Sequence, residues 1–424
     1  MSKNVEIPDE VDSLALKFLD IKGKPREIRV PVEMYDVVRE DGMSFDSSNV
    51  GFSDVSESDM IAVPQPSTMK VLDYGNEKVA VFLCETRWPD GTAFKGDPRY
   101  MLRKTMEELS ERGIKIRVKP EYEFHILDHE TYEPIDGGHY IDGRTRNTYM
   151  VGEMAKAMKK YDFKVEKIHH EVAPGQYEIE PLPYDDPLQA ADEFIFIRDI
   201  IKQKSAENGA FATFMPKPLP GEAGNGFHVH MSLYENGDYM FSPKELNEKA
   251  AGFIGGLLDH AKALSAVVSP TINSYKRLVP GYEAPVYISW GGENRSVLIR
   301  IPAYGSSEQK KGRIEYRAGD ASANIYFMLN SLIHAGIDGM ERSLDPGDEV
   351  KEDLFVKSDE EIKNRGIDFL PSDLDEALEE LKDDQVIKES LGESYKHYFR
   401  IKKEEVREFR QDVTDWELEN YLDY

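Results

Sequence analysis

The stretch PEYEFHIL (residues 120–127) decides the fold, because it places ionisable side chains at alternate positions of an otherwise apolar segment. In a β-strand, residues i and i+2 lie on the same face of the sheet, so Glu121 and Glu123 point one way while Phe124 points the other. A single half-buried strand of this kind would turn its carboxylates to solvent, and one such segment therefore decides nothing about function.

Four further segments repeat the pattern: GQYEIEPL (175–182), FHVHMSLY (227–234), RSVLIRIP (295–302) and RIEYR (313–317). They place Glu178 with Glu180, His228 with His230 and Ser232, and Arg313 with Glu315 and Arg317 on shared faces. Ile179, Phe227, Val229 and Ile314 lie between them and suit a packed opposite face. Together the segments mix Glu, His and Arg, and they predict a polar catalytic cleft built on a sheet.

Composition limits the classes of protein to consider. The chain has 424 residues, enough for two or three domains. Its net charge of −27 argues against nucleic acid as a partner, which needs a basic face. No apolar run reaches the ~18 residues of a membrane helix, and the N-terminus lacks a signal pattern. Cys84 is the only cysteine, which excludes an intrachain disulfide, and a cytoplasmic location fits.

Two domains are expected, with their boundary between residues 96 and 97. Residues 16–96 show short apolar alternations between Gly and Pro stops, including a hairpin over residues 15–32. Residues 97–424 begin with a helix that Asp97 caps and Gly113 ends. Further helices are expected over residues 186–209, 246–264, 322–339 and 395–424, and after a cap at Ser372.

The carboxylates form the first candidate site. Glu121, Glu123, Glu171, Glu178 and Glu315, with His228, could hold divalent cations. Oxygen ligands with little nitrogen and no thiolate favour Mg²⁺ or Mn²⁺, and six ligands are enough for two ions. The alternative for each single glutamate is a surface salt bridge.

The second candidate site is a set of arginines: Arg277, Arg295, Arg300, Arg313 and Arg317. One arginine guanidinium can donate to two oxygens of a phosphate or carboxylate at once. Arginines beside metal-binding carboxylates indicate phosphoryl transfer. Each arginine could instead pair with a structural glutamate.

Glu283 follows Pro280-Gly281 in a predicted loop, where it could cover the site and accept a proton, although a plain turn explains it equally.

Long stretches of the chain resemble type I glutamine synthetases. They are FDSSNVGFSDVSESDM (45–60), PDGTAFKGDPRYMLR (89–103), HHEVAPGQYEIE (169–180), ATFMPKP (212–218), NSYKRLVPGYEAP (273–285) and NRSVLIRIP (294–302). The resemblance runs from about residue 16 to the end. It implies an α+β fold, with a small β-grasp-like N-terminal domain (16–96) and a larger catalytic domain with a curved antiparallel sheet (97–424). It also implies ATP-dependent ligation of ammonia to glutamate through γ-glutamyl phosphate.

The resemblance also implies roles for individual residues. Two cations are implied, one held by Glu123, Glu171 and Glu178 and the other by Glu121, His228 and Glu315. Arg277, Arg295, Arg317 and the backbone of Gly224 correspond to glutamate and phosphate contacts. His230, Arg300, Arg313, Glu166, Ser232 and Lys310 correspond to ATP contacts. Glu283 corresponds to a flap glutamate that deprotonates ammonium. Asp46 corresponds to an aspartate that a neighbouring subunit donates to the ammonium pocket, near Tyr140.

Partners and regulation also follow from the resemblance. It implies a homo-oligomer of two stacked hexameric rings, a dodecamer, with small regulatory nitrogen proteins as conceivable partners. It implies a short form that is not adenylylated, because Phe355 and Val356 lie where a modified tyrosine would be.

The chain departs from the family pattern at the wall of the ammonium site, and this keeps alternatives open. The loop after Asp46 is one residue short, and Ala223 stands where an asparagine is usual. These two departures favour a γ-glutamylamide ligase that uses an organic amine. A third alternative is a nitrogen-status sensor without useful turnover, although all six metal positions are filled.

Overall fold

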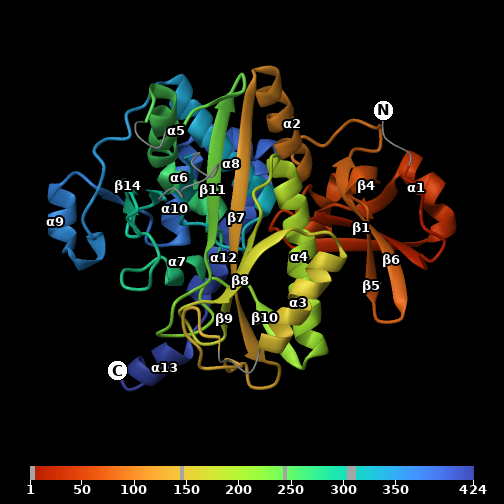
Figure 1. Ribbon diagram of the computed structural model, residues 1–424, viewed down its shortest axis with the longest axis horizontal. Coiled ribbons are helices and arrows are strands. Elements are labelled where there is room, and N and C mark those ends of the chain that lie inside the picture. Colours follow the sequence, from red (N-terminus) through yellow and green to blue (C-terminus); the bar gives the residue numbers. More distant parts are fainter. Residues whose placement is uncertain (1–4, 144–147, 242–245, 303–311) are drawn as a thin grey trace.

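The computed structural model describes residues 5–143, 148–241, 246–302 and 312–424, and it has the predicted α+β fold (Figure 1). A smaller sheet built from the N-terminal residues lies to one side of a larger sheet that carries the long strands β7 and β11. The prediction of this fold class is therefore confirmed.

The N-terminal sheet has six strands in the order β2-β1-β6-β4-β3, with β5 also on β6. The strands are β1 (Ser13–Leu19), β2 (Pro25–Pro31), β3 (Met43–Asp46), β4 (Asp59–Pro64), β5 (Lys70–Tyr74) and β6 (Glu77–Arg87). Strands β1 and β2 form the predicted hairpin, and Gly23 takes a φ of 78° in its turn. The short helix α1 (Tyr35–Asp41) was not predicted.

The larger sheet has nine strands in the order β14-β15-β16-β11-β7-β9-β8, with β10 on β7 and β12 on β11. The strands are β7 (Ile114–Asp128), β8 (Val165–His170), β9 (Gln176–Pro181), β10 (Ala210–Thr213), β11 (Phe227–Glu235), β12 (Asp238–Tyr239), β14 (Trp290–Gly292), β15 (Ile299–Ile301) and β16 (Ile314–Tyr316). All pairs are antiparallel except β14 with β15, which is parallel. A separate two-stranded sheet joins β13 (Tyr287–Ile288) to β17 (Asp368–Phe369).

Helices cover one face of the larger sheet. The helices that follow the N-terminal sheet in the chain are α2 (Pro98–Glu111), α3 (Thr148–Lys160), α4 (Pro187–Glu207), α5 (Glu248–Asp259), α6 (Ala261–Val268), α7 (Ser274–Arg277), α8 (Ile325–Glu341), α9 (Asp359–Asn364), α10 (Leu374–Asp383), α11 (Gln385–Ser390), α12 (Tyr395–Gln411) and α13 (Asp415–Tyr421). The rings of Tyr122 on β7 and Phe194 on α4 lie 4.8 Å apart, and both residues are buried. This packing leaves the opposite face of β7, with Glu121 and Glu123, for the candidate site.

The prediction of a single helix over residues 246–264 is wrong, because this segment forms two helices, α5 and the first part of α6. They meet at His260, whose Nδ1 lies 2.6 Å from Asp384 and whose Nε2 lies 3.0 Å from Asp338. Within the described residues, no single helix is both long and apolar enough to span a membrane. Helices α5 and α6 meet that test only as a pair, and they bend by 70° at their junction.

Two other predictions at helix ends were also wrong. Asp373, not Ser372, caps α10, since the Asp373 side chain accepts from the backbone N–H of Glu376 while Ser372 donates to the Glu376 carboxylate. The tail forms two helices because Thr414 starts a new capping box with Glu417.

Replacing Asp97 with alanine is expected to lower the free energy of unfolding by about 2 kcal/mol, since three donors would lose their acceptor. The buried carboxylate accepts from the N–H of Tyr100 at 2.7 Å, and from the N–H and hydroxyl of Thr86 at 2.9 Å each. Urea denaturation followed by circular dichroism measures the change. The variant Asp97→Asn, which keeps one acceptor oxygen, is the matched control; a loss below about 0.5 kcal/mol in the alanine variant would contradict the assigned cap role.

Candidate active site

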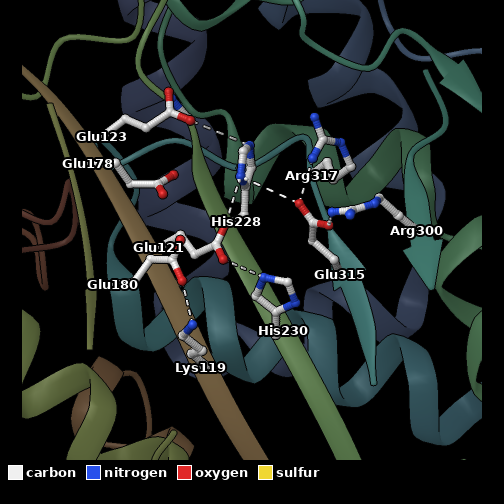
Figure 2. A network of polar contacts seen from close by, with 12 residues as sticks. Lys119, Glu121, Glu123, Glu178, Glu180, His228, His230, Arg300, Glu315 and Arg317 are labelled. Carbon is white, nitrogen blue, oxygen red and sulfur yellow. Dashed lines mark hydrogen bonds and ion pairs between the residues drawn. The ribbon is translucent and has the colours of Figure 1, made fainter. Parts of the chain in front are cut away.

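Strand register brings the alternating polar residues together on one face of the larger sheet. Across β16, β11 and β7, Glu315 pairs with His230 and His230 pairs with Lys119. His228 pairs with Glu121 across β11 and β7. Across β7, β9 and β8, Glu123 pairs with Glu178 and Glu178 pairs with His169. Figure 2 shows the side chains from β7, β9, β11 and β16 converging from neighbouring strands.

A cavity of about 270 Å³ lies over this face, and most predicted site residues line it. They are the six metal candidates Glu121, Glu123, Glu171, Glu178, His228 and Glu315, the five arginines Arg277, Arg295, Arg300, Arg313 and Arg317, and His230, Gly224, Glu283 and Tyr140. A larger cavity of about 770 Å³ lies between the β1–β2 hairpin and α12, but none of these residues lines it. The chemistry therefore points to the smaller cavity.

His228 lies at the centre of the carboxylates. Its Nδ1 is 3.4 Å from Glu121 and 3.6 Å from Glu315, and its Nε2 is 3.8 Å from Glu123. Among the described residues, Glu121 belongs to two groups whose ligand atoms lie within 4.8 Å of one another, one with Glu178 and His228 and the other with His230 and Glu315. This arrangement offers the ligand set of two adjacent cations.

Two carboxylates of this cluster, Glu178 and Glu171, lie where their negative charge is disfavoured. Burial, with Glu121, Glu123 and Glu171 nearby, raises the pKa of Glu178 well above its ordinary value. Burial and the charge of Glu123 raise the pKa of Glu171 to about 7. Buried carboxylates this close together repel one another unless protons or cations offset them. The donor set therefore fits divalent cations bound through oxygen and one imidazole.

Glu315 differs from Glu171 and Glu178, because arginines hold it. Nη1 of Arg317 donates to one carboxylate oxygen at 2.5 Å, and Nη1 of Arg300 donates to the other at 2.6 Å. Burial alone would raise the pKa of Glu315, but Arg317 and the nearby histidines lower it to about 2. Arg313 donates from Nε to Nδ1 of His230 at 3.2 Å. Arg300 and Arg317 border the carboxylates on the β15–β16 side (Figure 2).

Arg277 is buried. Among the described residues, its guanidinium donates hydrogen bonds to backbone carbonyls only. It donates to Ala318 at 2.9 Å and to Gly319 and Arg317 at 3.2 Å. Gly224 lies against it: a Cβ at that position would stand 2.2 Å from the Pro216 carbonyl oxygen. The close approach of these segments explains why glycine occupies position 224.

The loop over residues 279–284 reaches the cavity through Glu283, which takes a φ of 60°. Nη2 of Arg317 lies 3.5 Å from the Glu283 backbone carbonyl. Glu283 also lines a second cavity of about 660 Å³, shared with Arg295 and Arg317. Tyr140 also lines the cavity, with its ring edge-on to His169 at a centroid distance of 5.7 Å.

Three predicted site residues do not line the cavity, and a fourth lies outside the described residues. Asp46 lies exposed at the end of β3 in the N-terminal sheet, where hydrogen bonds from Ser48 and Asn49 lower the pKa of its carboxyl. Glu166 forms an ion pair with Lys119 at 2.8 Å, and Ser232 donates to the Gly312 carbonyl at 3.2 Å. Lys310 lies outside the described residues.

The strand predicted over residues 295–302 is shorter than expected, because Asn294 imposes a turn. The Asn294 side-chain oxygen accepts from the N–H and the hydroxyl of Ser296, while its amide donates to the carbonyls of Val350 and Glu352. The strand begins only at Ile299. Arg295 is therefore an exposed loop residue at the cavity edge rather than a strand residue.

Three residues that sequence reasoning did not assign also belong to the site. His169 lies 3.1 Å from Glu178 and 3.5 Å from Glu171. Lys119 and Lys167 pair with Glu180, which lines the cavity beside Glu178. Lys119 continues the alternation of Glu121 and Glu123 by one step, so the same period-two pattern could have included it.

Comparisons with known proteins agree with this geometry. A family model described as the glutamine synthetase catalytic domain matches residues 95–421, and one described as the glutamine synthetase β-grasp domain matches residues 10–89. A protein named glutamine synthetase from Pyrococcus abyssi is 41% identical, with 96% of this chain and 95% of the relative covered. Another from Thermotoga maritima is 40% identical, with 99% and 98% covered.

Solved structures resemble the chain over almost its whole length. A structure described as a GmaS/ADP complex superposes with a TM-score of 0.89 at 28% identity, and covers 98% of this chain and 97% of that chain. A structure described as apo GmaS without ligand gives a TM-score of 0.88 at the same identity and coverage. The fold and the sequence comparisons thus point to one family.

Proposed function

The chain belongs to the glutamine synthetase family, and we propose that it ligates ammonia to L-glutamate with ATP, giving glutamine, ADP and phosphate. The observation that carries this proposal is the cavity in which a carboxylate and histidine cluster meets five arginines. Such a combination suits transfer of a phosphoryl group to a carboxylate. Relatives about 40% identical over nearly their full length carry the name glutamine synthetase, which supports the same reaction.

In the first step, an oxygen of the glutamate γ-carboxylate attacks the γ-phosphorus of ATP, ADP leaves, and γ-glutamyl phosphate forms. Arg277, Arg295, Arg317 and the Gly224 backbone hold glutamate and the moving phosphate. His230, Arg300 and Arg313 face the ATP phosphates, with Glu166, Ser232 and Lys310 toward the rest of the nucleotide. Mg²⁺ or Mn²⁺, held when bound by Glu121, Glu123, Glu171, Glu178, His228 and Glu315, would offset the phosphate charge.

In the second step, ammonia attacks the acyl carbon and phosphate leaves. Only NH₃ is nucleophilic, so ammonium must first lose a proton, and Glu283 accepts it. The proton left on the new amide departs with the phosphate. Asp46, whose pKa its hydrogen bonds lower, supplies an ionised carboxylate to bind the cation, and Tyr140 lines the pocket.

The experiment that tests the function compares acceptors. Phosphate release is measured with ATP, Mg²⁺ and glutamate, with ammonium set against a panel of small organic amines, and the amide product is identified by mass. Faster turnover with ammonium supports the proposal. Poor use of ammonium with strong turnover of one amine would instead make the chain a γ-glutamylamide ligase, the function favoured by Ala223 in the cavity wall.

Asp46 requires a neighbouring subunit, since within one chain it lies on the N-terminal sheet and does not line the cavity. We propose that the chain forms the two-ring dodecamer implied by its family, with Asp46 completing a neighbour's site. A cytoplasmic location and regulation by small nitrogen-signalling proteins are further proposals from the same resemblance.

Mixing two inactive variants tests this arrangement. Asp46→Ala removes the donated carboxylate, and Glu121→Gln removes a ligand from the subunit's own site. Co-assembled at equal amounts, they are expected to restore about one quarter of the wild-type activity, since about a quarter of sites then combine both intact residues. Variants assembled separately and then mixed without exchange serve as the control. No recovery after co-assembly would contradict donation in trans.

A further inference from the structure

Glu180 is an additional carboxylate on the wall of the active-site cavity, and two lysines hold both of its oxygens. On β9 it follows Glu178 by two residues, so the two side chains share a face of the sheet. Lys119 of β7 donates to Oε2 of Glu180, and Lys167 of β8 lies 2.5 Å from Oε1. Figure 2 shows the contact between Lys119 and Glu180 next to Glu121.

The position of Glu180 would suit it to bind a metal ion. It lines the same cavity as Glu121 and Glu178, and its side chain is only 6% exposed. Yet among the described residues no group of three or more ligand atoms within 4.8 Å of one another includes Glu180. Glu180 differs from Glu178 in its partners: Oε2 of Glu180 faces Lys119, and Oε1 lies 2.5 Å from Lys167 and 3.9 Å from Nε2 of His169.

The lysines are held firmly in this arrangement. Lys119 is 10% exposed and also contacts Glu166 at 2.8 Å, so it bridges two carboxylates. Lys167 pairs with Glu180 in register across β8 and β9, and its half-exposed side chain lines the cavity. Lys119, Lys167, Glu166 and Glu180 carry two positive and two negative charges, so these four side chains balance one another without a bound cation.

We propose that Lys119 and Lys167 keep Glu180 from binding a divalent cation. The ammonium groups of the two lysines occupy the place where a further, dissociable cation would otherwise bind. An ammonium group and a divalent cation compete for the same carboxylate lone pairs. Arginines also hold both oxygens of Glu315, but Glu315 lies in a group of close ligand atoms, whereas among the described residues Glu180 lies in none. The lysines therefore act as positioning residues that limit how many cations the site takes. This inference rests on the proposed function, because it assumes that the adjacent carboxylates bind cations.

Counting bound Mn²⁺ tests the inference, with the ions added alone to the intact protein and no nucleotide or glutamate present. The variant K119M/K167M, which keeps unbranched side chains but removes both charges, is expected to bind about one more Mn²⁺ per chain than wild type. Adding E180Q to that variant is expected to return the count to the wild-type value. K249M, which breaks the surface pair of Lys249 with Glu235, should leave the count unchanged.

With the double variant, two outcomes would overturn the inference: an unchanged count in K119M/K167M, or an extra ion that survives the addition of E180Q. The single variant E180Q tests the inference even if the double variant does not fold. Its count is expected to equal that of wild type, and a lower count would show that Glu180 already holds a cation. Because the assay needs no turnover, loss of the proposed synthetase reaction and failure of this inference are separate results.

Discussion

Glu121→Gln is expected to lower kcat for glutamine formation by on the order of 10³-fold. Glu121 is shared by both groups of closely spaced ligands, and its carboxylate lies 2.7 Å from His230 and 3.4 Å from His228. The amide keeps the volume of the side chain but removes its charge, so the loss reports cation binding and charge stabilisation rather than packing.

The measurement is steady-state phosphate release with ATP, glutamate and ammonium, alongside Mn²⁺ affinity of the same variant. Glu235→Gln is the matched control, since Glu235 ends β11 and pairs with Lys249 on the surface. The control should retain wild-type kcat. If Glu121→Gln kept more than a tenth of the activity, the assignment of Glu121 as a ligand for the reaction would be wrong.

Glu283→Ala is expected to lower kcat with ammonium by about 10²- to 10⁴-fold, the usual contribution of a positioned general base. Glu283 reaches the cavity from a loop, and its carboxylate is the proposed acceptor of the ammonium proton. Raising the pH increases the fraction of free NH₃, so the variant should recover part of its activity at alkaline pH.

Glu293→Ala provides the control for the backbone. Glu293 also takes a positive φ, of 55°. It lines the neighbouring 660 Å³ cavity but not the 270 Å³ cavity over the carboxylates. Both substitutions therefore place alanine in a similar strained conformation. A comparable loss in the two variants, or an activity ratio of Glu283→Ala to wild type that does not change with pH, would contradict the role of Glu283 as proton acceptor.

The alternation of ionisable residues predicted the metal-candidate side of the site because it depends on local geometry. Glu121 and Glu123 share a face in any straight strand, and the structure places them opposite His228 and Glu178 as the pattern requires. The turn that moves Arg295 out of a strand was not predicted, because it depends on Asn294 bonding to residues more than 50 positions away.

The lysine pair around Glu180 also escaped prediction from the sequence. Lys119, Lys167 and Glu180 lie on three different strands, and only the register of β7, β9 and β8 reveals that they meet. The break between α5 and α6 has a similar cause, since His260 contacts residues on α8 and next to α11. Asp46 shows a further limit, because its proposed partner site belongs to another subunit.

The most direct test of the central claim follows the oxygen atoms of glutamate. Glutamate labelled with ¹⁸O in its γ-carboxylate is incubated with ATP, Mg²⁺, ammonium and the protein, and the released phosphate is analysed by mass. If the γ-carboxylate attacks the γ-phosphorus, one labelled oxygen passes to phosphate for each glutamine formed. Glutamine formation with unlabelled phosphate would contradict the proposed acyl phosphate and the roles assigned to this cavity.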